Sequence, residues 1–370
     1  MASHAISLET VQSVAKVLKK DILIAPAMLK QDMLGEIGVN VITGVENVES
    51  EFIPLTYGGA IRSYDPAKTY TDDDSKEVAQ VLERPLKVYT SYRPATLNLQ
   101  SFKEKEPWDS TDKVSEETLV KLPVTTYTLM QAGELYGQEV LAAFFDGDLG
   151  HGKNHPKGIY NGVRKLIELD MAQQTIEGVT VPVLISEAQG NLIKTDPIVK
   201  PASKDDFSAY TTFCGFVEKL DPQLRMNPDG CNIIVDMNRA LWIFEAYMNR
   251  FPQLQGTVKF NKGFEFFGHP GIRVMGTPLM GISDMMIATR PGNIDFAIAS
   301  EKDTNSVSVR QVGIDPNKLN MWIQSAQGAR IKNPTSAYFA VNAKTEDGKL
   351  YEIKPYTFGF KQIANTSDLG

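Results

Sequence analysis

The sequence predicts an α+β protein built of several extended parts, on three observations. Residues 264–341 hold a series of short runs in which apolar and polar residues alternate, as at Ile272 and Val274, and that period of two is typical of half-buried strands. Spacings of three and four between apolar residues predict helices elsewhere in the chain. Residues 1–45 and 46–100 are poorly suited to build cores of their own, so they should lie against something else.

Composition bounds the class of protein. The 370 residues are 42% hydrophobic and 22% charged, which is ordinary for a globular chain and enough for a sizeable core. This length corresponds to two or three compact units, or to one extended subunit of several parts. The net charge of −7 argues against sequence-specific nucleic-acid recognition, because such proteins are usually basic. A passive container for nucleic acid is not excluded by this charge.

The cysteines and the apolar runs indicate an intracellular protein. Cys214 and Cys231 are too few for a disulfide scaffold, and burial as small apolar residues is expected for both. No run approaches the roughly 18 to 20 apolar residues of a membrane span. The N-terminus lacks the basic-then-apolar order of a signal peptide, so we expect folding in a reducing cytoplasm.

The N-terminal segment, 1–45, begins with a helical pattern. Leu8, Val11, Ala15 and Leu18 share one helix face, and an apolar run broken by Pro26 follows. Such a segment either packs on its own body or lies as an arm on a neighbouring subunit. Composition leaves both alternatives open.

Residues 46–100 read as an extended β-hairpin. Strand-like runs at 50–58 and 84–99 flank a long polar tip, 59–77. The tip carries Asp72, Asp73 and Asp74, but adjacent acids on an extended backbone point to alternate sides. A solvated loop tip is therefore favoured over a metal site.

The middle of the chain predicts helices and strands in alternation. One helix should end at Asp146-Gly147, with a buried face formed by Leu129, Ala132, Tyr136, Val140 and Phe144. A strand is expected at 179–186, and another, covered on both sides, at 231–237.

Caps are predicted for the two helices that follow. Ser203 and Asp206 form a capping-box pattern before a helix whose buried face should hold Phe207, Tyr210, Cys214, Val217 and Leu220. Asn238 should cap the next helix, with Leu241, Phe244, Tyr247, Met248 and Phe251 buried.

Catalytic motifs are missing from the sequence. It contains no nucleophile elbow, phosphate-binding loop, dinucleotide fingerprint or zinc-protease motif. His151 and His155 have a zinc-like spacing, but Gly152 and Pro156 make a helix unfavourable there, so a polar loop is preferred. His269 precedes a proline and reads as a turn or interface residue. We therefore expect no catalytic residue, no metal site and no cofactor.

Three phrases carry a resemblance to a known family. They are "PKGIYNG" with Pro156, Gly158 and Ile159; "ATRPGNIDFAIASEKD" with Ala288, Thr289, Pro291, Asn293, Ile294 and Asp303; and "KNPTSAYFAV". Their order resembles the major capsid proteins of tailed bacteriophages, which have the Johnson fold. The sequence departs from the family pattern at Ile294, where leucine is usual, and it lacks the usual glycine of that phrase.

The resemblance implies a division of the chain into the parts of a capsid subunit. These are an N-terminal arm (1–45), an extended loop (46–100), a peripheral domain with a long spine helix (101–180 and 323–343), an axial domain (181–322) and a C-terminal tail (344–370). The arm and the loop would contact neighbouring copies. The implied assembly residues are Leu8, Val11, Leu18, Arg62, Tyr64, Lys68 and Tyr70.

The function implied by the resemblance is structural. Copies would form pentamers and hexamers of an icosahedral shell around packaged double-stranded DNA, and the shell would assemble in the cytoplasm of the bacterial host. Implied partners are a scaffolding protein, a portal and a maturation protease. Two alternatives stay open: an encapsulin-type compartment that stores an enzyme, and an enzyme or carbohydrate-binding module without a recognised motif.

Overall fold

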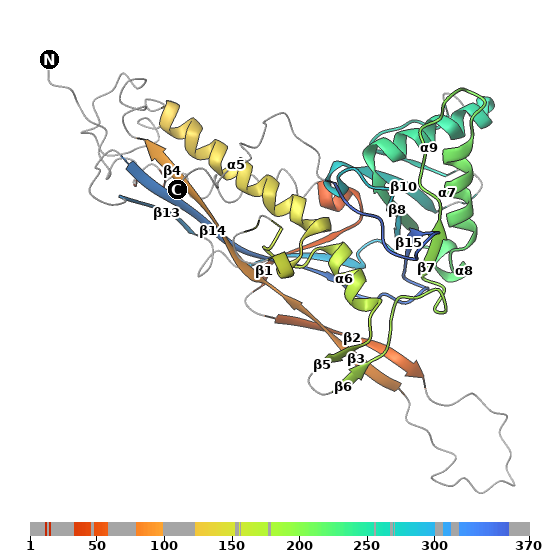
Figure 1. Cartoon of the computed structure of the whole chain (residues 1–370), viewed down its shortest axis with the longest axis horizontal. Coiled ribbons are helices and arrows are strands. Elements are labelled where there is room, and N and C mark those ends of the chain that lie inside the picture. Colours follow the sequence, from red (N-terminus) through yellow and green to blue (C-terminus); the bar gives the residue numbers. More distant parts are fainter. Residues whose placement is uncertain are drawn as a thin grey trace, which may run out of the picture.

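The chain folds into an elongated α+β molecule built on two sheets (Figure 1). The computed structural model describes residues 12, 15, 33–45, 48–57, 79–98, 123–151, 155, 157–176, 179–254, 257–266, 269, 271–299, 306–311 and 318–354. Within these ranges, none of the helices combines the length and apolar character needed to cross a bilayer.

The first sheet has six strands in the order β7-β15-β11-β8-β10-β9. Its strands are β7 (Leu192–Thr195), β8 (Cys231–Asp236), β9 (Gly263–Glu265), β10 (Ile272–Thr277), β11 (Ile287–Thr289) and β15 (Phe339–Lys344). All six residues of β8 are buried, as expected for a central strand covered on both faces. Alternate residues of β8 enter different cores, because Cys231, Ile233 and Val235 face one side and Ile234 faces the other.

Helices α7 (Ser208–Glu218) and α9 (Met237–Arg250) cover one face of this sheet (Figure 1). Three short helices lie in the connections: α8 (Pro222–Arg225) between α7 and β8, η3 (Pro252–Leu254) between α9 and β9, and η4 (Pro278–Met280) between β10 and β11. The core between helices and sheet is rich in aromatic rings, with Tyr210, Tyr247, Phe251 and Phe266 in mutual contact.

The second sheet has five strands and is organised around one long strand, β14 (Lys318–Ile331). On one edge, residues 318–327 of β14 pair with β4 (Tyr89–Asn98). On the other edge it pairs first with β13 (Ser306–Gln311) and then with β12 (Ile294–Ala299). Strand β1 (Asn40–Val45) adds to β12 in parallel.

The long helix α5 (Pro123–Asp146) lies along this second sheet (Figure 1). A buried polar cluster fixes it there. The Tyr136 hydroxyl lies 2.7 Å from the hydroxyls of both Ser91 on β4 and Ser325 on β14, and it accepts a 3.0 Å hydrogen bond from Gln327. Because a half-satisfied buried network is costly, these partners specify one position of α5 on the sheet.

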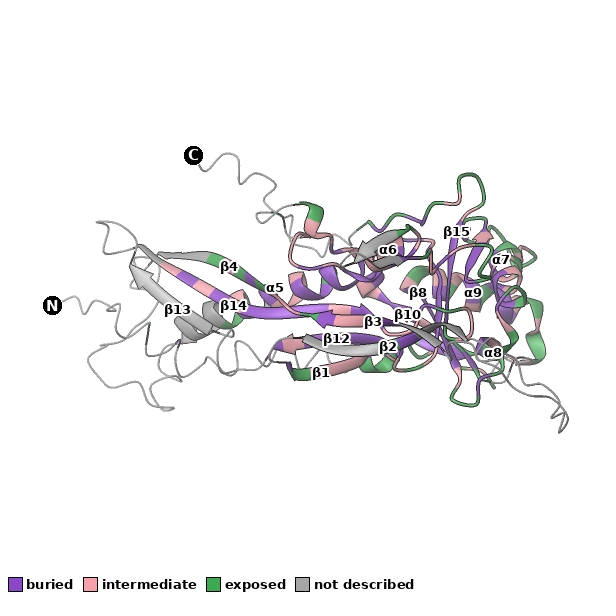
Figure 2. Cartoon of the chain, turned by 90° about the horizontal axis from the view of Figure 1, so that it is seen from below, coloured by how far each residue is buried: buried purple, intermediate pink, exposed green. Residues whose placement is uncertain are grey.

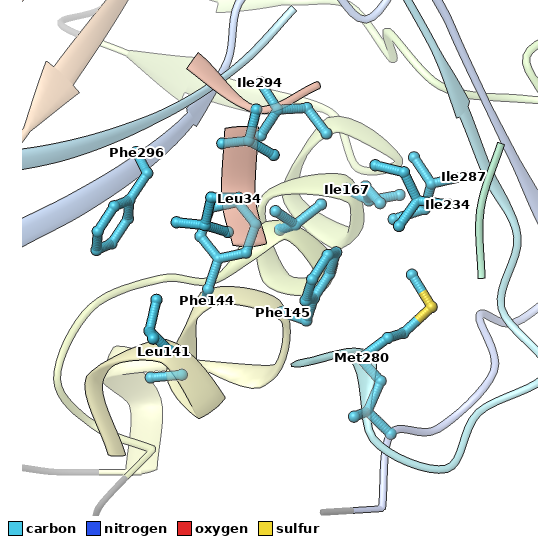
Figure 3. Packing of buried hydrophobic residues seen from close by; sticks show 14 of the residues in the cluster. Leu34, Leu141, Phe144, Phe145, Ile167, Ile234, Met280, Ile287, Ile294 and Phe296 are labelled. Carbon is cyan, nitrogen blue, oxygen red and sulfur yellow. The ribbon is translucent and has the colours of Figure 1, made fainter. Parts of the chain in front are cut away.

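A single core joins the two sheets. Near its C-terminal end, α5 packs Phe144 against Phe145 and against Phe296 of β12, with ring centroids 4.9 and 5.6 Å apart (Figure 3). The same cluster holds Ile234 and Ile287 of the six-stranded sheet. The buried residues therefore run without a break from one sheet to the other (Figure 2).

An amide pair marks the place where the chain crosses between the sheets. Asn293 Nδ2 donates to the Asn333 carbonyl and Asn333 N–H donates to Asn293 Oδ1, both at 2.9 Å. The two crossing segments, 290–293 and 332–338, are thus bonded to each other as strands would be. Gly292 N–H also donates to the carbonyl of Gly38 at 2.7 Å, which brings the residues before β1 into this joint.

The hairpin expected at 46–100 forms, but its second strand differs from the prediction. Strand β2 (Val48–Tyr57) pairs with β3 (Ala79–Lys87), and the ribbon projects from the body (Figure 1). Residues 89–98 leave the ribbon and join the five-stranded sheet as β4. A run of strand-like residues does not reveal that its pairing partner changes at Val88.

Several local predictions are confirmed. Helix α5 covers the expected 129–144 and ends at Asp146 as predicted. The short helix α6 (Val163–Asp170) follows it and buries Val163 and Ile167. Strand β8 matches the prediction for 231–237 within one residue.

Both predicted helix caps are wrong. Helix α7 begins at Ser208, and the Asp206 carboxylate accepts from the N–H groups of Ala202 and Ser208 instead of closing a box with Ser203. These two bonds lower the pKa of Asp206. Helix α9 begins at Met237, before Asn238.

Both predicted helix faces are confirmed only in part, because Val217, Leu220, Tyr247 and Met248 are buried as predicted whereas Leu241 is exposed. The buried residues are Ala209, Phe213, Phe216 and Val217 on α7, and Ala240, Ile243, Ala246, Tyr247 and Met248 on α9. Where most of a helix is apolar, spacing alone does not select the buried face.

Other expectations meet the structure only in part. The strand expected at 179–186 is three residues, β6 (Val179–Val181), paired with β5 (Gln174–Ile176) and ended by Pro182, which lacks an N–H for the ladder.

The domain boundaries stay a prediction. Strands β12 and β13, inside the range assigned to the axial domain, pair with β14, whereas β15 belongs to the six-stranded sheet.

The fold predicts that Phe144→Ala is strongly destabilising. The side chain is fully buried between both sheets, so its removal should cost about 3–5 kcal/mol of unfolding free energy. Denaturant unfolding of unassembled subunits measures this cost. Phe52→Ala, at a side chain that is 64% exposed, is the control and should change stability by about 0.5 kcal/mol or less. Equal effects of the two substitutions would contradict the shared core.

Candidate assembly site at the root of the hairpin

The root of the β2–β3 hairpin is the place where β3 passes into β4. The backbone approaches β14 closely here, because a Cβ added at Gly328 would overlap the carbonyl of Lys87. A small apolar cluster of Leu86, Val45 and Ala297 lies beside this crossing. The backbone of β3 thus passes from the projecting ribbon into the body at this crossing.

Arg84 of β3 binds two elements of the body at once. Its Nη1 and Nη2 atoms donate to the two oxygens of Asp170, at 2.6 and 2.8 Å, in a bidentate ion pair. Its Nε and Nη2 atoms also donate to the carbonyl of Ile331, at 3.2 and 3.0 Å. Asp170 ends α6 and Ile331 ends β14, so one guanidinium joins hairpin, helix and sheet.

A second ion pair lies directly behind the first. Arg330 of β14 donates to Asp295 Oδ2 of β12, with contacts of 3.0 and 2.5 Å, and Lys332 lies 3.3 Å from the other oxygen. Asn40 of β1 donates to Asp295 Oδ1 at 2.9 Å. Arg330 Nη1 also donates to the Arg84 carbonyl at 3.1 Å, which links the two pairs.

This arrangement of charges is suited to holding the hairpin, α6 and the five-stranded sheet together. Three cations, Arg84, Arg330 and Lys332, surround two buried carboxylates, Asp170 and Asp295. Each carboxylate oxygen has a donor, so neither acid is left as a free base. Breaking one pair would leave an uncompensated charge inside the protein, which is why the geometry of the root is specific.

The sequence holds few signals for these residues, and its patterns do not predict them. Asp295 and Arg330 are single charges within the apolar strands IDFAIA and GARI. A lone charge in a buried strand requires a partner, and this is the signal that could have found both. Arg84 and Asp170 lie 86 residues apart and have no such signal.

The predicted assembly residues cannot be compared with this site. Leu8, Val11, Leu18, Arg62, Tyr64, Lys68 and Tyr70 all lie outside the described residues, as do Asp72, Asp73 and Asp74. Their roles stay predictions.

The two histidines of the H-x-x-x-H spacing do come together. Their rings stack with centroids 4.8 Å apart, and His155 Nδ1 accepts the Lys157 N–H at 3.1 Å. The nearby acids have other partners, because Asp146 pairs with Lys157 and Arg164, and Asp148 with Lys165. In the described part of the chain, no three metal-ligating side chains gather at one point.

Neither cysteine has the setting of a reactive thiol. Both are free; Cys214 is half-buried on α7 and Cys231 is buried at the start of β8. Burial raises the pKa of Cys231 to about 12 and also raises that of Cys214. Both thiols are therefore protonated at neutral pH, when thiolate would be the nucleophile.

Comparison with known proteins finds similar structures but no similar sequence. No family model and no characterised protein sequence matches the chain. A capsid protein of cyanophage A-1(L) is 11% identical over 84% of this chain and 91% of its own, with a TM-score of 0.48. The capsid of an empty GTA particle gives 13% identity over 84% and 88%, with a TM-score of 0.46. A virus-like particle from Pyrococcus furiosus gives 11% over 87% and 96%, with a TM-score of 0.41.

The site predicts a large effect for Asp295→Asn. Removing this charge leaves Arg330 buried without its ion pair and should cost about 3–5 kcal/mol of unfolding free energy. Glu265→Gln is the matched control, because Glu265 and Arg273 form a pair in which both side chains are more than half exposed. Exposed pairs contribute about 0–1 kcal/mol. Denaturant unfolding measures both losses. Similar losses in the two variants would show that the buried pair contributes no more to stability than the exposed pair.

Proposed function

We propose that this chain is the subunit of an icosahedral protein shell, assembled through its projecting hairpin. The observation that carries the proposal is the β2–β3 ribbon, which leaves the body with Phe52 64% exposed. A strongly exposed aromatic side chain on a projecting ribbon is suited to be covered by another molecule.

A second exposed aromatic side chain lies on the five-stranded sheet. Ser91 points toward α5, where it bonds Tyr136, so the next residue, Tyr92, lies on the opposite face and is 58% exposed. The register places Pro94 opposite Trp322 on that same face. Together, Tyr92, Pro94 and Trp322 form what we call the sheet platform.

The hairpin cannot cover the sheet platform of its own chain. Phe52 pairs with Glu83, and Tyr92 follows Glu83 by nine residues along β3 and β4. At about 3.3 Å per residue, this extended backbone separates the two aromatic sites by roughly 30 Å. Contact between them is therefore possible only between copies.

A contact between different patches of two copies is heterologous, and such contacts close into rings when the rotation allows. Rings of this kind are the pentamers and hexamers of a shell. The similar structures named above come from capsids and a virus-like particle, the same class that we propose here. The support, however, rests on the chain's own ribbon, platform and sequence phrases.

We further propose that the shell is the capsid of a tailed phage or prophage, assembled in the host cytoplasm around double-stranded DNA. Its acidic composition suits a container loaded by a motor, since such a container need not attract its cargo. In this proposal the arm residues Leu8, Val11 and Leu18 and the loop-tip residues Arg62, Tyr64, Lys68 and Tyr70 contact neighbouring copies. A scaffolding protein, a portal and a maturation protease are its partners.

The proposal predicts closed particles from the purified full-length protein. Size-exclusion chromatography and electron microscopy at several salt concentrations should show uniform shells, or pentamers and hexamers that close into shells. A compact monomer at every concentration would overturn the proposal, and ligand-dependent melting of that monomer would favour an enzyme or a carbohydrate-binding module.

Particles isolated from the native host identify the cargo. Nuclease-protected double-stranded DNA is the expected content. A co-purified enzyme without DNA would instead identify an encapsulin-type compartment.

The hairpin contact predicts that Phe52→Asp and Tyr92→Asp each prevent assembly. A buried aromatic contact contributes about 1.5–3 kcal/mol, and a charge in its place would have to be desolvated at every interface. Subunit melting should be unchanged, because both side chains are exposed within one chain. Met226→Asp is the control, at a residue on the six-stranded-sheet side that is 75% exposed. Normal shells from Phe52→Asp would exclude this contact.

A further inference from the structure

We infer that the bidentate pair between Arg84 and Asp170 sets the angle at which the hairpin leaves the body, and through this angle the curvature of the assembled particle. The inference rests on the proposed shell function. It assigns to Arg84 a positioning role, because the residue acts through the hairpin and does not itself form the contact between copies.

The other attachments of the hairpin are made by side chains, which are Leu86 at the crossing and the buried pair Ile53 and Leu82 further out. Among the described strands, β2 and β3 pair only with each other, so no ladder of backbone hydrogen bonds fixes the ribbon to either sheet. The apolar cluster of Leu86, Val45 and Ala297 holds the end of β3 at the crossing. Leu86 lies next to the pivot at Val88, so this cluster alone gives little control over rotation about that pivot.

Arg84 lies further out along the ribbon and therefore has leverage. It is four residues from Val88, about 13 Å in an extended strand, whereas Ala79 at the far end of β3 is roughly 30 Å away. A displacement at Arg84 is thus about doubled at Ala79. Phe52 lies opposite Glu83, next to Arg84, so a change in this pair reaches the proposed contact almost undiminished and reaches the far end of β3 enlarged.

The chemistry of the pair is suited to fixing a direction. A guanidinium that binds a carboxylate through two parallel hydrogen bonds is oriented in its plane, whereas an ammonium group is a point charge. Two further bonds to the Ile331 carbonyl, and the bond from Arg330 to the Arg84 carbonyl, hold the same residue from the sheet side. Hairpin, α6 and β14 therefore meet at a single planar group.

The angle matters because the contact between copies is heterologous. The rotation that relates one copy to the next decides whether a ring closes and with what curvature, or whether an open assembly grows. If the hairpin angle varies widely, one sequence can form rotations other than those of the pentamers and hexamers of one shell. We therefore expect a uniform particle size to depend on the Arg84–Asp170 pair.

The first test compares particles of the full-length protein with those of Arg84→Lys and Asp170→Asn. Arg84→Lys keeps the charge and removes the planar fork, so the subunits should retain their secondary structure. Expected products are particles of mixed diameter, open sheets or tubes, seen by electron microscopy. Arg273→Gln, which removes an exposed pair at the edge of the six-stranded sheet, is the control and should give the diameter of the unchanged protein. Uniform particles of normal diameter from Arg84→Lys would overturn the inference.

A second measurement tests the angle in single subunits. Spin labels are attached through Phe52→Cys on the ribbon and Met226→Cys on the body, with Cys214→Ser to remove the half-buried thiol. Pulsed electron resonance should give a broader distance distribution in Arg84→Lys than in the matched protein with Arg84. An unchanged distribution would also overturn the inference.

The two measurements separate this inference from the proposed function. If the unchanged protein forms no particles, the shell proposal fails, and with it the effect on curvature. The distance distribution still decides whether Arg84 positions the hairpin. If shells form and neither readout changes in the variants, the shell proposal stands and the role of Arg84 is excluded.

Discussion

A buried carboxylate, Asp295, ties the extended part of this protein to its body. It lies on β12 with no exposed surface, and it receives hydrogen bonds or ion pairs from Asn40, Arg330 and Lys332. Through the bond from Arg330 to the Arg84 carbonyl, its influence reaches β3 as well. A buried charge must be paired and hydrogen-bonded, so the relative positions of four strands follow from one acid.

The rest of the architecture builds outward from this point. β14 carries Arg330 near one end and the platform residue Trp322 nearer the other, and β4 pairs with its residues 318–327. Helix α5 is fixed on the far face of the same two strands through Tyr136, while Phe144 continues the core into the six-stranded sheet. One long strand pair thus places the ribbon at one end and the aromatic sheet platform at the other. This separation allows the ribbon of one copy to reach the platform of another.

Local sequence pattern predicted the helices and strands that neighbouring residues alone determine. The period of α5 and the continuous apolar run of β8 are properties of neighbouring residues, and both elements form where expected. Pairing across the chain has no such local cause. Ser91 and Ser325, which share a ladder, are 234 residues apart, and nothing near Val88 in the sequence shows that the partner strand changes there.

The failed caps and the missed ion pairs have a common physical origin. Asp206 and Asn238 could each have capped a helix, but a polar side chain binds whichever donor the surrounding structure offers. Charged residues such as Asp170 and Arg84 carry no sign of their partner until the fold brings them together. Spacing in sequence therefore located the helices and strands of this protein better than it located the groups that hold them together.

The joint between the two sheets differs in chemistry from the root of the hairpin. Asn293 and Asn333 join the crossing segments through amide and backbone groups, neither of which gains or loses a proton in the physiological range. The hairpin, by contrast, is held by carboxylates and guanidinium groups. The root of the hairpin therefore depends on charges that must each keep a partner, whereas the amide joint aligns the sheets without adding a charge to the interior. The molecule thus uses a neutral attachment at one junction and an ionic attachment at the other.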